Sequence, residues 1–209
     1  MARSLPEYDV HPSVRTMADW IDGLKAKTGR SLEEWLTHIR GEGPEGEPEV
    51  RAWLKREHGL GTNAAWWLAE RSAGKGGQED TPEGYLRAAR DYVETMYEKK
   101  EMLRPIHDAI IKAARDLGGD VRVCPCQTIV PLYRAHVFAQ IKPSTRTRLD
   151  MGLCLTPLVK QNKTIPDRLV DTGGFAKKDR ITHRIGLCSI EDFDRDARGW
   201  LRRAYELDG

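Results

Sequence analysis

The sequence predicts an α+β protein, with an N-terminal helical domain and a C-terminal domain in which a mainly antiparallel sheet has helices packed on one face. Apolar residues recur at three- and four-residue intervals up to Leu117, as in amphipathic helices. After Gly118-Gly119 the apolar residues alternate with polar ones, as in strands with one buried face. Residues 74–80 (GKGGQED) have no apolar side chain and indicate a linker. We therefore expect a helical domain at 1–73, a linker at 74–80 and an α+β domain at 81–209.

Four helices are expected in the N-terminal domain. Ser13 is placed to cap a helix that runs to about Lys27 and carries an apolar stripe. A capping box at 31–34 (SLEE) opens a second helix. Two more helices follow at 49–58 and 62–71, and the short connection between them predicts an element of the helix-hairpin-helix kind.

The C-terminal domain is expected to begin with helices and to continue as a sheet. Thr81 and Pro82 are a typical helix start, and this helix should run to about Leu103 before Pro105 interrupts it. The remaining expected elements are a helix at 106–117, strands near 121–123, 128–133, 136–142, 146–155 and 181–187, and a final helix from about 189 to 205.

Composition limits the classes of function. Hydrophobic residues make up 39% of the 209 residues and the net charge is +2, so the chain is not a polycation and nucleic-acid binding would need a local patch. No apolar run approaches the roughly 18 residues that span a bilayer, and the first residues lack the apolar core of a signal peptide. We expect a cytoplasmic protein with no membrane partner. The cysteines are interpreted as reduced, buried or incidental thiols, so no metal site and no cofactor is expected: Cys124, Cys126, Cys154 and Cys188.

Alternation along the strands predicts a charged sheet face. Residues 136, 138, 140 and 142 should point away from Val137, Ala139 and Ile141, and a hairpin should bring Arg148 and Asp150 beside them. The strand at 181–187 adds His183 or Arg184, depending on its register. The candidate ligand-binding residues are Tyr133, Phe138, Gln140, Lys142, Arg148, Asp150, His183 and Arg184.

Two interpretations of this face stay open. It is either a solvent-facing surface with ordinary ion pairs, which contribute little to stability, or a site for an anionic or hydrogen-bonding ligand. In the second case Lys142 and Arg148 are the donors, and Phe138 or Tyr133 provides an aromatic wall.

The connection Gly59-Leu60-Gly61 carries the alternative function. In helix-hairpin-helix elements a tight turn presents backbone N–H groups and a helix N-terminus to a phosphate. The nucleic-acid-binding residues in this interpretation are Lys55, Arg56, His58, Gly59 and Gly61. Plain packing of two helices across a glycine turn explains the same pattern, because glycine adopts positive φ at little cost.

No common catalytic motif is present, so no catalytic residue is assigned. The leading prediction is a non-enzymatic protein that holds a small polar or anionic ligand on the sheet face, for sequestration or sensing. The alternatives are nucleic-acid binding through the helical hairpin and an enzyme of unknown class using His183 or Asp150. The sequence does not predict an oligomeric state.

Two segments carry a family resemblance. The segment 27–35 (KTGRSLEEW), together with Val50, Trp53-Leu54-Lys55, His58-Gly59-Leu60-Gly61 and Ala65, resembles a small helical domain of unknown function found in bacterial proteins. The segment 138–153, with its Pro143-Ser144-Thr145 turn, and 182–185 (THRI) resemble a second domain of unknown function, of the "predicted transport protein" type. The C-terminal end is also similar to small iron-chaperone-like α+β domains. The resemblance implies a two-domain protein and transfers no catalytic residue.

Overall fold

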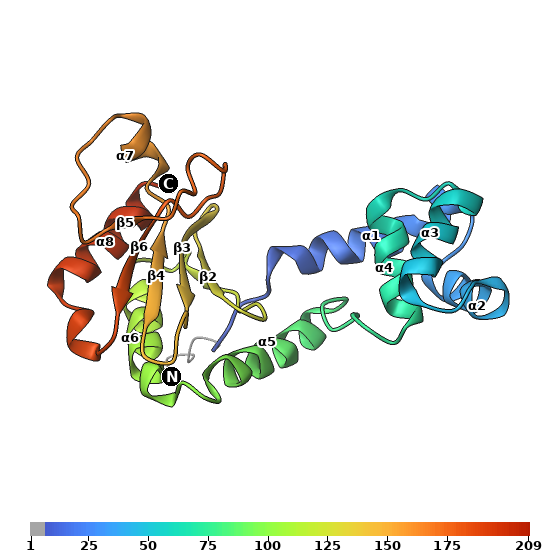
Figure 1. The fold of residues 1–209 in the computed structure, drawn as a ribbon, viewed down its shortest axis with the longest axis horizontal. Coiled ribbons are helices and arrows are strands. Elements are labelled where there is room, and N and C mark those ends of the chain that lie inside the picture. The colour runs from blue at the N-terminus through green and yellow to red at the C-terminus, as the bar shows by residue number, and fades with distance from the viewer. Residues whose placement is uncertain (1–6) are drawn as a thin grey trace. The chain divides into compact units, whose positions relative to one another are not determined.

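The structure is a computed structural model that describes residues 7–209 (Figure 1). Its contacts divide the chain into two units, a helical unit at His11–Ala88 and an α+β unit that combines residues 7–10 with Ala89–Gly209. This division differs from the boundaries expected at 73 and 81, which stay a prediction. None of the described helices is long and apolar enough to cross a bilayer.

The helical unit contains the four expected helices, which are α1 (Pro12–Thr28), α2 (Leu32–Glu42), α3 (Glu47–His58) and α4 (Thr62–Ser72). The capping box of α2 is confirmed, because Glu34 N–H donates to Ser31 Oγ and Ser31 N–H donates to Glu34 Oε2. The predicted cap of α1 is wrong. His11 caps this helix, with Nδ1 accepting the Ser13 N–H at 3.0 Å, because the helix already begins at Pro12.

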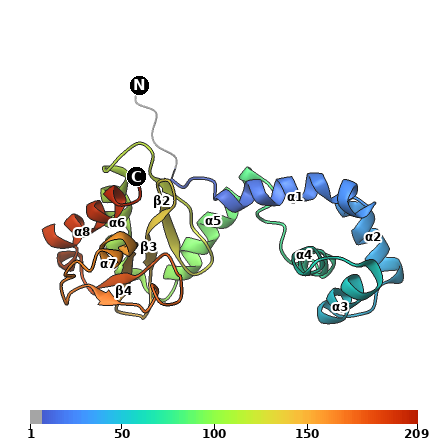
Figure 2. The same cartoon turned by 90° about the horizontal axis from the view of Figure 1, so that it is seen from above.

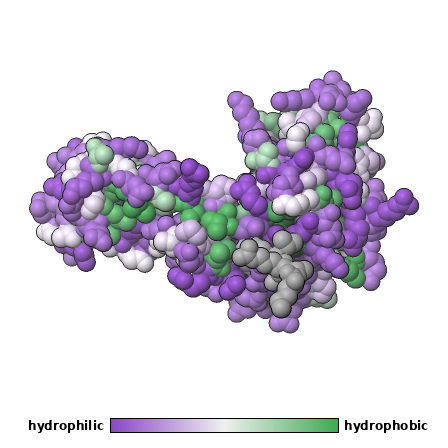
Figure 3. All heavy atoms as spheres, turned by 180° about the vertical axis from the view of Figure 1, so that it is seen from behind, coloured by the Kyte–Doolittle hydropathy of each residue, from purple (hydrophilic) through white to green (hydrophobic). Residues whose placement is uncertain are grey.

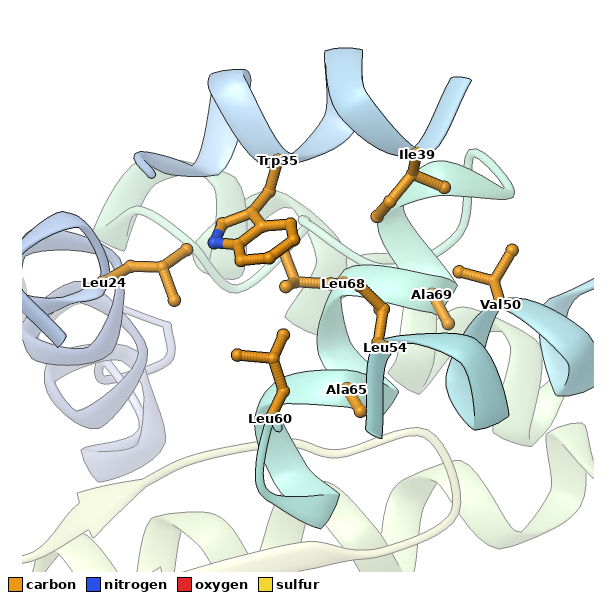
Figure 4. Close-up of a cluster of buried hydrophobic side chains, with 9 residues drawn as sticks. All are labelled: Leu24, Trp35, Ile39, Val50, Leu54, Leu60, Ala65, Leu68 and Ala69. Atoms are coloured by element: carbon orange, nitrogen blue, oxygen red, sulfur yellow. The ribbon is translucent and has the colours of Figure 1, made fainter. Parts of the chain in front are cut away.

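The helical unit has a core of its own. Nine buried side chains meet between the helices (Figure 4): Leu24, Trp35, Ile39, Val50, Leu54, Leu60, Ala65, Leu68 and Ala69. Trp35 is fully buried, and its Nε1–H donates to Thr28 Oγ1 at 2.8 Å. The large ring is therefore buried without leaving its polar atom unpaired.

The α+β unit holds the C-terminal elements. Its helices and strands are the C-terminal part of α5 (Pro82–Tyr97), η1 (Glu101–Leu103), α6 (Arg104–Arg115), β1 (Arg122–Val123), β2 (Val130–Tyr133), β3 (Val137–Lys142), β4 (Leu149–Leu153), α7 (Thr156–Lys160), β5 (Val170–Asp171), β6 (His183–Leu187), η2 (Ile190–Asp192) and α8 (Arg195–Glu206). Helix α5 ends before the expected Leu103, because the Lys100 N–H returns to the Tyr97 carbonyl and the chain turns into η1. Both β5 and α7 were missed, since each is very short.

Within residues 7–209, all six strands pair antiparallel, in the order β1-β2-β3-β4-β6-β5. Helices α6 and α8 lie on one side of this sheet (Figures 1 and 2), with α8 against β3 and β4. The sheet side chains that face the helices are buried and apolar: Ala139, Ile141, Leu149, Met151, Leu153, Ile185 and Leu187. The predicted α+β class, with helices on one face of the sheet, is confirmed. Hydrophilic side chains cover most of the visible outer surface (Figure 3).

Candidate functional site

Asp150 is the centre of the polar sheet face. Lys142 lies directly across from it on β3, and Gly186 lies across from it on β6. Its carboxylate lies 2.9 Å from Arg148 Nε and 3.0 Å from an Arg184 guanidinium nitrogen. Ser144 Oγ donates to the same carboxylate at 2.6 Å. The Asp150 side chain is only 12% exposed, so burial from bulk water strengthens these contacts.

The single carboxylate at the centre of the face is therefore fully paired, and the two guanidinium groups leave one positive charge in excess. Arg148 and Arg184 both direct their charge at Asp150, where the prediction had Arg148 as a donor to a ligand. The glycine at 186 leaves room for this network. A Cβ at Gly186 would lie 3.1 Å from Arg148 Cδ, so the arginine stem occupies the space that a side chain would fill.

A pocket lies beside this network. It has a volume of about 450 Å³ and is lined by Thr95, Met96, Glu98, Lys99, Lys100, Gln127, Thr128, Lys142, Pro143 and Ser144. Three lysines and one glutamate surround it, so positive charge is in excess. The Lys100 ammonium donates to the Pro143 carbonyl, which holds the segment after α5 against the turn after β3. We call this the lysine pocket.

The lysine pocket joins predicted and missed residues. Lys142 was predicted as a ligand donor and lines it, whereas Lys99, Lys100, Thr128 and Ser144 were not identified. The available signal was the Lys99-Lys100 pair at the end of a helical pattern. A pair of lysines in the sequence does not show that the end of α5 lies beside the turn after β3, because the position of α5 relative to the sheet depends on tertiary packing.

The predicted aromatic wall is wrong. Phe138 is fully buried and packs on Tyr205 of α8, with ring centroids 5.6 Å apart. The β2–β3 register shifts so that Leu132 pairs with Ala139 and Tyr133 with Val137. This leaves Phe138 as an extra residue in β3, and such a bulge breaks the alternation of faces.

Tyr133 does not reach the lysine pocket either. It pairs with Val137 at the start of β3, whereas Lys142 is at the end, roughly 16 Å away at about 3.3 Å per residue. Its ring instead lies under the Arg122 guanidinium, 5.6 Å from the ring centroid. Gln140 keeps its predicted face and packs over Gly152.

Strand β6 resolves the open choice between His183 and Arg184. Arg184 is on the polar face with Asp150, whereas His183 pairs with Leu153 and is on the opposite side. His183 is buried, its Nδ1 lies 3.0 Å from Thr182 Oγ1, and burial lowers its pKa. His183 and Asp150 therefore do not form one catalytic group, and the prediction of His183 as a residue of the ligand-binding face is wrong.

The helical hairpin is present, with a different arrangement of its charges. Gly59 has φ 63° and ends α3, and Gly61 precedes α4 without a side-chain cap. Lys55 is exposed, and Arg56 pairs with Glu57 at 2.9 Å. A pocket of about 630 Å³ borders the turn and is lined in part by Trp20, Lys27, Trp67 and 59–64.

His58 points into the helical unit, not toward a ligand at the turn. Its ring contacts Trp53 with centroids 4.5 Å apart, and Trp35 at 5.1 Å. Burial, and then the neighbouring His38, lower the pKa of His58. The predicted contribution of His58 to phosphate binding stays a prediction, although its ring already packs against Trp53 and Trp35.

The described residues contain no group of three or more His, Cys, Asp or Glu side chains placed to hold a metal ion. Cys124 is a buried thiol, and burial raises its pKa to about 12. It is therefore a poor nucleophile at neutral pH. Cys188, in contrast, is exposed on the surface.

Comparisons with known proteins agree with a two-domain organisation. Residues 93–208 match the domain of unknown function DUF5655, and residues 16–71 match the domain of unknown function DUF4287. A search of curated proteins found no match, and a search of solved structures found none either. The first match includes both the lysine pocket and the Asp150 network and spans more than half of the 209 residues. The chain therefore belongs to the DUF5655 family.

Proposed function

We propose that the α+β unit binds a small anionic molecule in the lysine pocket, as a non-enzymatic protein of sequestration or sensing. The observation that carries this proposal is the convergence of Lys99, Lys100 and Lys142 on one pocket of about 450 Å³. Thr128 lines the same pocket and carries a hydroxyl group, whereas the Ser144 hydroxyl proton is already donated to Asp150. Ammonium and hydroxyl donors around a concave site favour phosphate or carboxylate groups.

The Asp150 network supports this role indirectly. Ser144 Oγ donates to Asp150, so the turn that carries Lys142, Pro143 and Ser144 is attached to β4 and β6 through one carboxylate. When the turn is already fixed, less conformational entropy is lost when a ligand binds to the donors that the turn carries. In this proposal Arg148 and Arg184 position the pocket wall, and the lysines contact the ligand.

The test uses defined anions on the full chain. Inorganic phosphate, pyrophosphate, citrate and adenosine monophosphate are titrated by calorimetry, with thermal shift as a second readout. At least one should bind, and Lys142→Gln should weaken that binding about 10-fold, equivalent to about 1.4 kcal/mol. Lys112→Gln removes an exposed lysine of α6 that does not line the pocket and is the matched control.

Two results would overturn the proposal. One is the absence of binding by all four anions up to about 1 mM, since such affinity is too weak for a ligand site. The other is binding that Lys142→Gln and Lys112→Gln weaken equally, because that pattern indicates general charge attraction without a defined pocket.

Nucleic-acid binding by the helical unit is a second candidate. It is favoured by the uncapped start of α4 and by the pocket that Lys27 and the 59–64 turn line. Binding to phosphates should fall steeply between about 50 and 200 mM salt. Fluorescence anisotropy with single- and double-stranded DNA and RNA measures this, and Lys55→Gln should weaken it. No binding at the lower salt concentration would exclude the candidate.

Several expectations from the sequence stay proposals beside these. A cytoplasmic location, a bacterial origin and the resemblance to a "predicted transport protein" belong to this group. The alternative of an enzyme that uses His183 or Asp150 also stays a proposal, and any such chemistry would use one of the two residues alone, because they are on opposite faces of the sheet.

A further inference from the structure

Two histidines of the helical unit meet ring to ring. His38 of α2 and His58, the last residue of α3, have their Nε2 atoms 3.3 Å apart, with ring planes at 80°. They are 20 residues apart in the sequence, so only the packing of α2 against the end of α3 brings them together. Neither histidine takes part in the function proposed for the lysine pocket.

The distance between the Nε2 atoms of His38 and His58 matches the distance between two ligands of one metal ion. Imidazole nitrogens lie about 2.0–2.1 Å from a zinc ion, so two such ligands on a tetrahedral ion are about 3.3–3.4 Å apart. A hydrogen bond from a ring N–H to an oxygen is about 2.7–3.2 Å, and one to a nitrogen is slightly longer. The observed 3.3 Å is therefore at the long end for a hydrogen bond between the two rings, and it also matches the spacing of two ligands on one ion.

Glu42 occupies the position of an orienting carboxylate. Its Oε1 lies 3.3 Å from Nδ1 of His38, the ring nitrogen that faces away from His58. Metal-binding histidines commonly have a carboxylate at their second nitrogen, which directs the lone pair of the first nitrogen toward the ion. Glu42 lies four residues after His38 on the same helix, so one helical face supplies both groups.

The aromatic side chains around the pair hold the rings in place. Trp53 packs against both His38 and His58, with centroids 5.4 and 4.5 Å apart. Trp35 packs against both from the other helix. The His38 side chain is 10% exposed while that of Glu42 is 72% exposed, so the pair lies at the edge of the core, where water reaches it.

We propose that His38 and His58 form a transition-metal site of two imidazole ligands, with Glu42 as a positioning residue and water in the remaining coordination positions. The chemical class is a divalent ion that prefers nitrogen ligands, namely copper, nickel or zinc. Calcium and magnesium prefer oxygen ligands and are not expected to bind. An ion held by α2 and α3 would also join two helices of the helical unit.

The test uses the full chain and nickel(II). Calorimetry should show one ion bound per chain. Nuclear magnetic resonance should show the ring protons of His38 and His58 broadened by the paramagnetic ion before those of His11 or His136. His38→Gln should weaken nickel binding at least about 10-fold, and Glu42→Gln should weaken it by about 10-fold. His136→Gln removes an exposed histidine of the other unit and should have no effect.

The resonance experiment needs no variant, so the proposal can be tested even if His38→Gln fails to fold. Nickel that broadens His136 as strongly as His38 and His58 would overturn the proposal. So would a folded His38→Gln variant that keeps its affinity for nickel within about two-fold, since the loss of one of two ligands must weaken binding.

Discussion

His107 shows how burial of a single residue makes the fold depend on pH. It is fully buried on α6, its Nδ1 lies 3.0 Å from the Tyr97 hydroxyl, and its Nε2 has no hydrogen-bond partner among the described residues. Burial, and then the nearby Arg104 guanidinium, lower the pKa of His107 to about 3. Between about pH 3 and pH 6.5 the His107 ring is therefore neutral in the folded chain, whereas the same ring binds a proton in the unfolded chain.

The free energy of unfolding should therefore depend on the protonation of His107. The pKa of His107 is about 3 in the folded chain and 6.5 in the unfolded chain. The stability that comes from keeping this ring neutral is therefore fully present above pH 6.5, and it is lost as the pH falls toward about 3. Between pH 6 and 4.5 the wild type should lose about 1.4 kcal/mol more per pH unit than His107→Gln. Urea unfolding at several pH values measures the difference, with His136→Gln as the exposed control. Parallel curves for wild type and His107→Gln would contradict the argument.

The turn between α3 and α4 contains two glycines, and its conformation depends on Gly59 more than on Gly61. Gly59 has φ 63°, which L-residues with a side chain rarely adopt, whereas Gly61 has φ −64°. A Cβ at either position would meet nothing within 4 Å. Any difference between the two substitutions must therefore come from backbone conformation and not from a clash.

The second prediction follows for the turn. Gly59→Ala should destabilise the helical unit by about 1 kcal/mol, because alanine resists the left-handed conformation. Gly61→Ala should change stability by less than about 0.5 kcal/mol. Alanine is a poorer N-cap for α4 than glycine, but it also lowers the conformational entropy of the unfolded chain, and the two effects oppose each other. Chemical denaturation of both variants measures the pair. Equal losses would show that the turn does not need positive φ at residue 59.

For the whole molecule, the α+β unit is discontinuous in sequence. Asp9, which precedes the helical unit, accepts the Val123 N–H at 2.8 Å and pairs with Arg115 at 2.9 Å. The Asp9 N–H also donates to the Val123 carbonyl. A residue at the start of the chain therefore stabilises a strand that follows more than a hundred residues later.

The third prediction tests this discontinuity. Asp9→Ala should destabilise the α+β unit by about 2 kcal/mol, because it leaves a buried N–H and an arginine without their acceptor. Hydrogen exchange should accelerate in β1 and β2 and stay unchanged in α2 and α3. Asp22→Ala, at an exposed position of α1, is the control. Faster exchange confined to α1 would contradict the assignment of Asp9 to the α+β unit.

Local patterns are enough to predict the class of fold and most of its elements, because periodicity involves residues that are close together in the chain. Apolar periodicity predicted the four helices of the helical unit, and alternation predicted the hairpin of β3 and β4. The capping box at Ser31 and Glu34 depends on residues only three positions apart, so it too was predictable.

The meeting of side chains from different elements could not be predicted from such patterns. A bulge in β3 turned Phe138 toward α8, and strand register put Arg184, not His183, beside Asp150. The lysine pocket and the His38–His58 pair combine residues from separate elements. Periodicity predicts which face of its own helix or strand a residue occupies. It does not predict which other element packs against that face, because that contact forms between elements that are distant in sequence.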